Sequence, residues 1–381
     1  MLQTLPEEVL ERLCSHVGPY ASVEALSSLA LVSKQLAISV RNFRSRHPLV
    51  RSSTAAREYC RRHDTSSPHA VTLTIAKGTR TRVETVKVGR MKVVREVEDS
   101  VTEEDLVQLC RKSPKVVNLR LVEPGFSSLR RRQIGFASSL SNLRSLSIIG
   151  RQGSTADSPD LGFNLTTIGQ ILSTLPTLEH LELRNVRSSP TSLSGFSPPS
   201  FHLSSLLLFT TPFLSPRHLT WLLSSSNESE SLRTIKFHLP TSVLPFQLHP
   251  IYWAPIRVTS FYISCHDPKK IESMPSHLPH LERFEFNLLS EPSSVDGRML
   301  LKNSNQYHRL REIRDYSEAG GLELRSLAEG LLLYRRRVKV EKITIRRGRK
   351  NEDGYRELWA VCGDLSITLE ESEGVAPDRL S

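Results

Sequence analysis

The sequence predicts an α/β fold built from short units, each contributing one strand and a helix or turn. Three observations support this fold class. One spacing of apolar residues recurs eight times along the 381-residue chain, the positions between those residues are almost all polar, and stretches with helical patterning lie just before several predicted strands. A unit of this kind can bury its apolar face only against neighbouring units, so we expect the copies to stack into an array with a parallel sheet.

The repeated spacing is apolar-x-x-apolar-x-apolar. The clearest copies start at Leu143, Leu178 and Leu281, and looser copies start at Val116, Leu203, Leu232, Val258 and Val340. Successive starts are 27, 35, 25, 29, 26, 23 and 59 residues apart, and a degraded copy, LREIRDY, begins at Leu310 within the last interval. The mean unit of about 28 residues resembles that of leucine-rich repeats. This resemblance implies a solenoid with a curved parallel sheet and helices on its convex side.

Two positions within each copy lie between the apolar ones and should project from the other face of the strand, because residues two apart share a face. In chain order these pairs are Asn118 and Arg120, Ser145 and Ser147, His180 and Glu182, Ser205 and Leu207, Thr234 and Lys236, Ser260 and Tyr262, Arg283 and Glu285, and Lys342 and Thr344. Only Leu207 is aliphatic. The candidates for contact with a partner are Asn118, Arg120, His180, Glu182, Lys236, Tyr262, Arg283, Glu285 and Lys342.

Helical signals occur where a strand-plus-helix array requires them. Residues 102–111, TEEDLVQLCR, open with the capping-box spacing of Thr102 and Asp105 and end shortly before Pro114. Comparable helical stretches are expected at residues 167–175, 215–225 and 322–336.

A different, non-repeating segment stands at the front of the chain. Thr4, Leu5, Pro6 and Glu7 combine a capping box with a proline in the first helical turn, and an apolar stripe of Val9, Leu10, Leu13, Cys14 and Val17 follows at helical spacing. Two further short helices are expected at residues 23–30 and 33–40. Three helices in fewer than fifty residues form a marginal domain that a partner would stabilise.

This segment resembles an F-box. LPEEVLERLCSHV followed by LSSLALVSKQL has the opening Leu-Pro, the acidic residue and the closing Val-Ser-Lys element of that family, here Val32, Ser33 and Lys34. The match covers residues 5–40. It departs from the usual pattern at Ala25, where an aspartate is common, and at Leu36, where an aromatic residue is usual.

The resemblance implies a substrate-recognition subunit of an SCF-type ubiquitin ligase, which binds a Skp-type adaptor and, through it, a cullin. The positions that match the adaptor-binding and core positions of the family are Leu5, Pro6, Val9, Leu10, Leu13, Leu26, Leu29 and Val32. The repeat region would then hold a protein substrate. An alternative at this point is an F-box protein that acts outside a cullin complex.

The domain boundaries follow from these patterns. We expect the F-box at residues 1–48, a connecting region with a helix, a strand and a hairpin at 49–100, the solenoid at 101–370 and a disordered acidic tail at 371–381. The basic run 346–350, followed by Asp353, Gly354 and the strand-like YRELWAVC, predicts a terminal hairpin that caps the last unit.

Composition limits the class of protein further. The chain has no apolar run long enough to span a membrane, and its five scattered cysteines suggest no disulfide framework, so we expect a cytoplasmic or nuclear protein without membrane contact. The net charge of +11 is concentrated in residues 41–100 and 335–350. A positive field attracts acidic proteins or nucleic acid, which leaves a basic scaffold for either partner as another alternative.

No catalytic or cofactor motif is present in the sequence. There is no Gly-rich phosphate loop, G-x-S-x-G elbow or H-E-x-x-H pair, and His277 and His280 lie between prolines expected to form a loop. We therefore expect no enzyme activity, no cofactor and no metal site.

Overall fold

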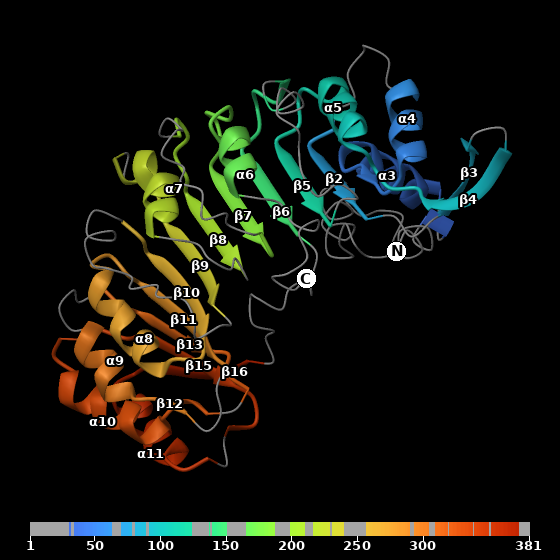
Figure 1. The fold of residues 1–381 in the computed structure, drawn as a ribbon. Helices are drawn as coiled ribbons and strands as arrows, with labels where there is room; N and C mark the ends of the chain where they lie inside the picture. Colours follow the sequence, from blue (N-terminus) through green and yellow to red (C-terminus); the bar gives the residue numbers. More distant parts are fainter. Residues whose placement is uncertain are drawn as a thin grey trace. The chain divides into compact units, whose positions relative to one another are not determined.

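The fold was obtained as a computed structural model (Figure 1). It describes residues 30–31, 34–62, 70–77, 81–88, 91–123, 137, 139–150, 165–186, 199–209, 216–228, 231–239, 257–289, 293–304, 309–318, 320–337, 339–349 and 352–372. The chain divides into two compact units, unit 1 at Met1–Leu178 and unit 2 at Glu179–Ser381. Each unit is described by itself below.

Unit 1 combines a parallel sheet, an antiparallel hairpin and helices. The sheet strands pair in the order β1 (Leu49–Val50), β2 (Thr72–Ala76), β5 (Asn118–Val122) and β6 (Ser145–Ile149). Strands β3 (Thr81–Val88) and β4 (Met91–Glu98) form the hairpin. The described helices are α3 (Lys34–Arg46), α4 (Ser53–Arg62), α5 (Glu103–Lys112) and α6 (Leu165–Leu172).

Helix α5 confirms the capping prediction. The Thr102 side chain accepts a hydrogen bond from the backbone N–H of Asp105, and the Asp105 carboxylate accepts one from the backbone N–H of Thr102. Leu106 and Leu109 on this helix are fully buried, as are Leu119 and Leu121 on β5. Local capping and burial of the apolar stripe therefore act together to place α5 in the core of unit 1.

Unit 2 is a longer run of the same strand pattern. Its parallel strands follow one another in sequence order: β7 (His180–Arg184), β8 (Ser205–Phe209), β9 (Thr234–Leu239), β10 (Ser260–Cys265), β11 (Arg283–Leu288), β13 (Glu312–Asp315), β15 (Lys342–Arg346) and β16 (Thr368–Ser372). Strands β12 (Ser294–Val295) and β14 (Gly321–Leu322) form a separate short parallel pair.

Helices of unit 2 connect these strands. They are α7 (Pro216–Glu228), α8 (Pro268–Ser273), α9 (Gly297–Ser304), α10 (Leu324–Tyr334), α11 (Tyr355–Asp364) and the 3-10 helix η4 (Met274–His277). Figure 1 shows α8 to α11 gathered along one face of the unit 2 sheet. Close packing of α9 on α10 requires glycine at Gly297, because an added Cβ would lie 2.5 Å from the Leu327 Cα.

The apolar positions of the repeated spacing form the core of unit 2. Phe237 packs edge-on against Phe261 with ring centroids 5.7 Å apart, and Phe261 stacks on Phe284 at 6.3 Å. The first apolar residues of these copies, such as Leu232, Val258 and Leu281, are also buried. The periodicity thus identified the core-facing positions correctly.

The structure confirms a mixed α/β fold with parallel strands in sequence order and helices near three of the other predicted stretches, at α6, α7 and α10. The predicted terminal hairpin is wrong. YRELWAVC lies in helix α11, where Leu358, Val361 and Cys362 are buried at helical spacing, and β16 runs parallel to β15. Burial of the 3.6-residue pattern outweighs the strand propensity of these residues.

Two predicted boundaries also change. Strands β1 and β2 pair in parallel with each other, and β2 pairs with β5, so residues 49–100 supply part of the unit 1 sheet and do more than connect. Glu371 and Ser372 belong to β16, so the array extends beyond residue 370. The remainder of the predicted tail, residues 373–381, and most of the predicted F-box helices lie outside the described residues.

Candidate functional site

The candidate site is the polar face of the unit 2 sheet, which we define by two rows of side chains in register. The first row is His180, Ser205, Thr234, Ser260, Arg283, Glu312, Lys342 and Thr368. The second row, two residues further along each strand, is Glu182, Leu207, Lys236, Tyr262, Glu285, Arg314, Thr344 and Glu370. Because parallel strands place equivalent residues side by side, each row runs across the strands.

Charged side chains at the centre of the polar face are joined to one another. Glu312 accepts hydrogen bonds from Arg283 on β11 and from Arg314 on its own strand. Burial by itself would raise the pKa of Glu312, but the hydrogen bonds to Arg314 and Arg283 outweigh it, so the pKa lies below its ordinary value. The carboxylate is therefore held in its charged form between two guanidinium groups.

Tyr316 extends this network. Its hydroxyl lies 3.5 Å from the Glu285 carboxylate, and its ring packs edge-on to Tyr262 with centroids 6.3 Å apart. Burial raises the pKa of the Tyr316 phenol. These contacts join Glu285, Glu312, Arg314 and Tyr316 into one hydrogen-bonded network at the centre of the polar face.

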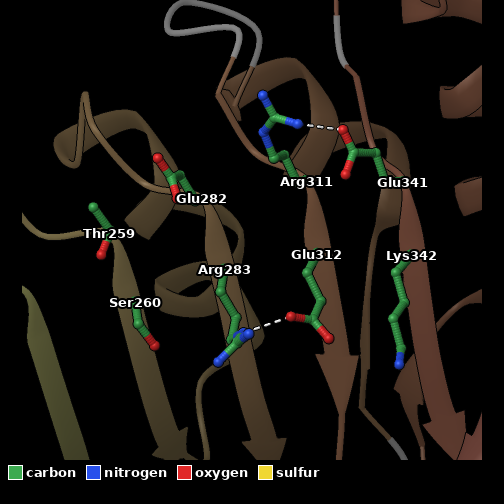
Figure 2. A pocket seen from close by; sticks show the side chains of 8 residues that line it. All are labelled: Thr259, Ser260, Glu282, Arg283, Arg311, Glu312, Glu341 and Lys342. Carbon is green, nitrogen blue, oxygen red and sulfur yellow. Dashed lines mark hydrogen bonds and ion pairs between the residues drawn. The ribbon is translucent and has the colours of Figure 1, made fainter.

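A groove of about 390 Å³ lies where strands β10, β11, β13 and β15 begin (Figure 2). It is lined by Thr259, Ser260, Glu282, Arg283, Arg311, Glu312, Glu341 and Lys342. Opposite charges alternate along it. Arg283 pairs with Glu312, Arg311 pairs with Glu341, and Lys342 pairs with Glu370 at 2.7 Å.

The structure brings several predicted partner-binding residues to this face. Arg283 is exposed, Lys342 is half-exposed and both line the groove. Glu285 projects on the same side but is 6% exposed. Tyr262 lies on the predicted face, in the second row, but it is 1% exposed and packs against Tyr316.

Other predicted residues lie further along the rows. His180 is exposed, with its Nδ1 3.2 Å from the Ser204 hydroxyl, while Glu182 pairs with Arg184 and Lys236 is half-buried. Asn118 and Arg120 belong to unit 1, where Asn118 donates a hydrogen bond to the Thr72 hydroxyl at 3.2 Å. Seven of the nine candidates therefore lie in the two rows of unit 2.

The predicted adaptor-binding residues cannot be placed on the fold. Leu5, Pro6, Val9, Leu10, Leu13, Leu26, Leu29 and Val32 all lie outside the described residues. The nearest described apolar side chain, Leu31, is 88% exposed. Helix α3 extends to Arg46, six residues beyond the end predicted for the third helix, with Leu36, Val40 and Phe43 buried.

Sequence reasoning located a degraded copy at Leu310 but did not read the polar side chains of its strand, β13, as candidates. Glu312, Arg314 and Tyr316 lie in or directly after β13, within the degraded copy LREIRDY. Reading the intervening positions of that copy, as for the eight clearer ones, would have found Glu312 and Arg314.

Within the described residues, no group of three or more His, Cys, Asp and Glu side chains is placed to hold a metal ion. In the same residues no helix combines the length and apolar character needed to cross a bilayer. No protein-family model matches the chain, and its sequence matches no curated protein.

Proposed function

We propose that the chain is the substrate-recognition subunit of an SCF-type ubiquitin ligase. In this proposal the F-box-like segment at residues 5–40 binds a Skp-type adaptor, and through it a cullin, while the strand array binds a protein substrate. The observation that supports this proposal is the F-box-like pair of segments LPEEVLERLC and LVSKQL, which precedes a long array of parallel strands. The polar face of unit 2 supports the second half of the proposal, because it offers a groove lined by charged side chains.

The chain would act as a tether without covalent chemistry of its own. One end would bind the ligase and the other the substrate, so that substrate lysines are held at high effective concentration near the transferring enzyme. The fixed ion pairs of the polar face suit this role, since a preorganised surface loses less entropy on binding.

Replacement of Leu5 and Pro6 together by alanine tests the adaptor half of the proposal. We expect the double variant to lose co-purification of the adaptor, because a few apolar anchors carry most of such an interface. The matched control replaces Leu332 and Leu333, which are 47% and 68% exposed on unit 2, by alanine. Equal adaptor recovery from both variants, with unchanged thermal melting, contradicts the proposal.

Net charge favours a second candidate, a basic scaffold that binds nucleic acid. The chain carries +11 overall, with nine basic residues against one acidic residue at 335–350. Binding of this kind weakens steeply with added salt and requires no adaptor. Immunoprecipitation from cell extract, with detection of adaptor, cullin and RNA, separates the ligase subunit, an F-box protein outside a cullin complex and the scaffold.

A further inference from the structure

A row of basic side chains lies just before the amino ends of four neighbouring strands of unit 2, and the sequence periodicity did not reveal it. The row lies three residues before the first paired residue of β10, β11, β13 and β15, and we call it the basic edge: Arg257, His280, Arg309 and Lys339. Parallel pairing continues back toward this row, because the backbone N–H groups of Glu282, Arg311 and Glu341 each bond to the preceding strand. Four successive strands therefore present equivalent side chains at one edge.

Contacts between neighbours confirm this placement. An Arg309 guanidinium nitrogen lies 2.8 Å from the Nδ1 of His280, and Arg233 donates a hydrogen bond to the carbonyl of Arg257 at 3.3 Å. Arg257, Arg309 and Lys339 are exposed, and His280 is half-exposed. The row thus displays three exposed cations, with His280 between Arg257 and Arg309 and no carboxylate among the four residues.

The groove of Figure 2 is lined by residues that lie two and three positions further along the same four strands, and no residue of the basic edge lines it. Its three cations, Arg283, Arg311 and Lys342, are matched in number by the three carboxylates Glu282, Glu312 and Glu341, so the excess of positive charge lies in the basic edge. Three further exposed arginines, Arg335, Arg336 and Arg337, follow helix α10 and precede Lys339 in the chain. A concentrated positive field of this kind attracts an anionic partner and accelerates its association.

We propose that the basic edge binds an extended acidic peptide segment of a protein partner, with Asp or Glu carboxylates on Arg257, Arg309 and Lys339. The inference deepens the proposed function. It rests on that function where it identifies the acidic partner with the ligase substrate. Adjacent strands lie about 4.8 Å apart, so Arg257 and Arg309, two strands apart, are separated by about 10 Å. An extended peptide rises about 3.3 Å per residue, so acidic residues three positions apart match the separation of Arg257 and Arg309. Arg309 and Lys339 precede adjacent strands, so they can share one carboxylate.

A carboxylate peptide fits this edge better than a nucleic acid does. The exposed carboxylates of Glu282 and Glu341 lie immediately behind the basic edge and would face a continuous phosphate backbone. The basic edge also contains no Phe, Tyr or Trp on which bases could stack. A peptide can place neutral residues opposite these glutamates.

The test uses the full chain and a fluorescent synthetic peptide with glutamate at every third position, separated by serine and glycine. The variant replaces Arg257, Arg309 and Lys339 by glutamine. Its matched control replaces three cations that are exposed on helices, Lys269, Arg298 and Arg356, by glutamine. We expect the edge variant to bind the peptide at least about tenfold more weakly, since each exposed charge contributes modestly and three are lost, while the control binds like the parent chain.

Two further probes complete the design. A peptide with glutamine in place of glutamate should not bind, and a single-stranded oligouridylate should bind more weakly than the acidic peptide at the same salt concentration. Equal loss in the edge and control variants, or tighter binding of the oligouridylate, overturns the inference.

Adaptor co-purification separates this inference from the proposed function. The edge variant should still bring down the adaptor, because it leaves residues 5–40 unchanged. Loss of peptide binding by the edge variant together with no adaptor binding by the parent chain means that the ligase proposal fails and the acidic-peptide surface stands. Normal adaptor binding by the parent chain, together with equal peptide binding by the edge and control variants, means that the ligase proposal stands and the acidic-peptide inference fails.

Discussion

In unit 1 the polar side chains of β2, β5 and β6 are mostly neutral, whereas in unit 2 those of β11, β13, β15 and β16 are mostly charged. Thr72 and Asn118 share a neutral hydrogen bond in the first unit, while Arg283, Glu312 and Arg314 share charge-assisted ones in the second. Both units bury the same apolar positions, as Leu121 and Phe286 illustrate. The apolar positions thus specify the strand array in both units, and the intervening positions are where the units differ in chemistry.

The difference extends to buried charge. Arg349, at 7% exposed, donates to the Asp315 carboxylate at 2.6 Å and to the Leu322 carbonyl at 2.7 Å. Asp315 also accepts from the backbone N–H groups of Ser317 and Leu322. This buried pair ties the end of β13 to the segment after β15.

Replacement of Arg349 by methionine should produce the largest effect. It leaves the Asp315 carboxylate buried without its cation, which should lower the free energy of unfolding by about 3 kcal/mol. Urea denaturation followed by circular dichroism measures the change. The half-buried Arg120 of unit 1, replaced by methionine, should cost less than about 1 kcal/mol.

A second variant identifies the cause of that loss. Replacing Asp315 by asparagine in the Arg349→Met background should recover part of the stability, because no unpaired buried charge then remains. Equal losses from Arg349→Met and Arg120→Met would show that buried charge does not distinguish the two units.

The sequence was informative about the fold wherever local and tertiary signals agreed. The apolar spacing located the strands because only those positions face the core, and the Thr102 capping box located the start of α5. Helix α11 was misread because the aromatic and β-branched residues of YRELWAVC favour a strand locally, while packing against α10 selects the helix. The very short strands β1, β12 and β14 carry too few residues to show a period.

The site was less predictable from sequence. Alternation identifies which side of a strand a residue faces, but the exposure of that side depends on neighbours from other strands, as Tyr262 beside Tyr316 demonstrates. The basic edge joins residues separated by 23, 29 and 30 positions in the chain, and only the strand register aligns them.

Replacement of Glu312 by glutamine should have an intermediate, pH-dependent effect. At neutral pH it removes two charge-assisted hydrogen bonds and should lower the free energy of unfolding by about 1 to 3 kcal/mol. Folding lowers the pKa of Glu312 below the ordinary 4.5. The extra stability of the parent chain over Glu312→Gln is therefore fully present at pH values well above 4.5. It is lost as the pH falls through the lower folded-state pKa.

Denaturant midpoints measured across this pH range check the sign. The curves of the parent chain and Glu312→Gln should converge in acid. Glu341→Gln provides the control, because Glu341 and Arg311 form a pair whose side chains are 61% and 59% exposed. We expect less than about 1 kcal/mol for that surface pair at any pH. Parallel curves for Glu312→Gln and the parent would contradict the assigned role of Glu312.

The smallest effect concerns equivalent hydroxyl groups in the two units. Thr344 is 6% exposed, and its Oγ1 is buried without a hydrogen-bond partner in the described part of the chain. Valine has nearly the same shape and removes the unsatisfied hydroxyl, so Thr344→Val should raise the free energy of unfolding by about 1 kcal/mol. Ser147 of β6 occupies the corresponding position of its own copy of the apolar spacing, is 5% exposed and has an interaction partner. Ser147→Ala should therefore lower the free energy of unfolding by up to about 1 kcal/mol. Thermal melting checks the two signs, and melting temperatures that shift in the same direction for Thr344→Val and Ser147→Ala would contradict this difference.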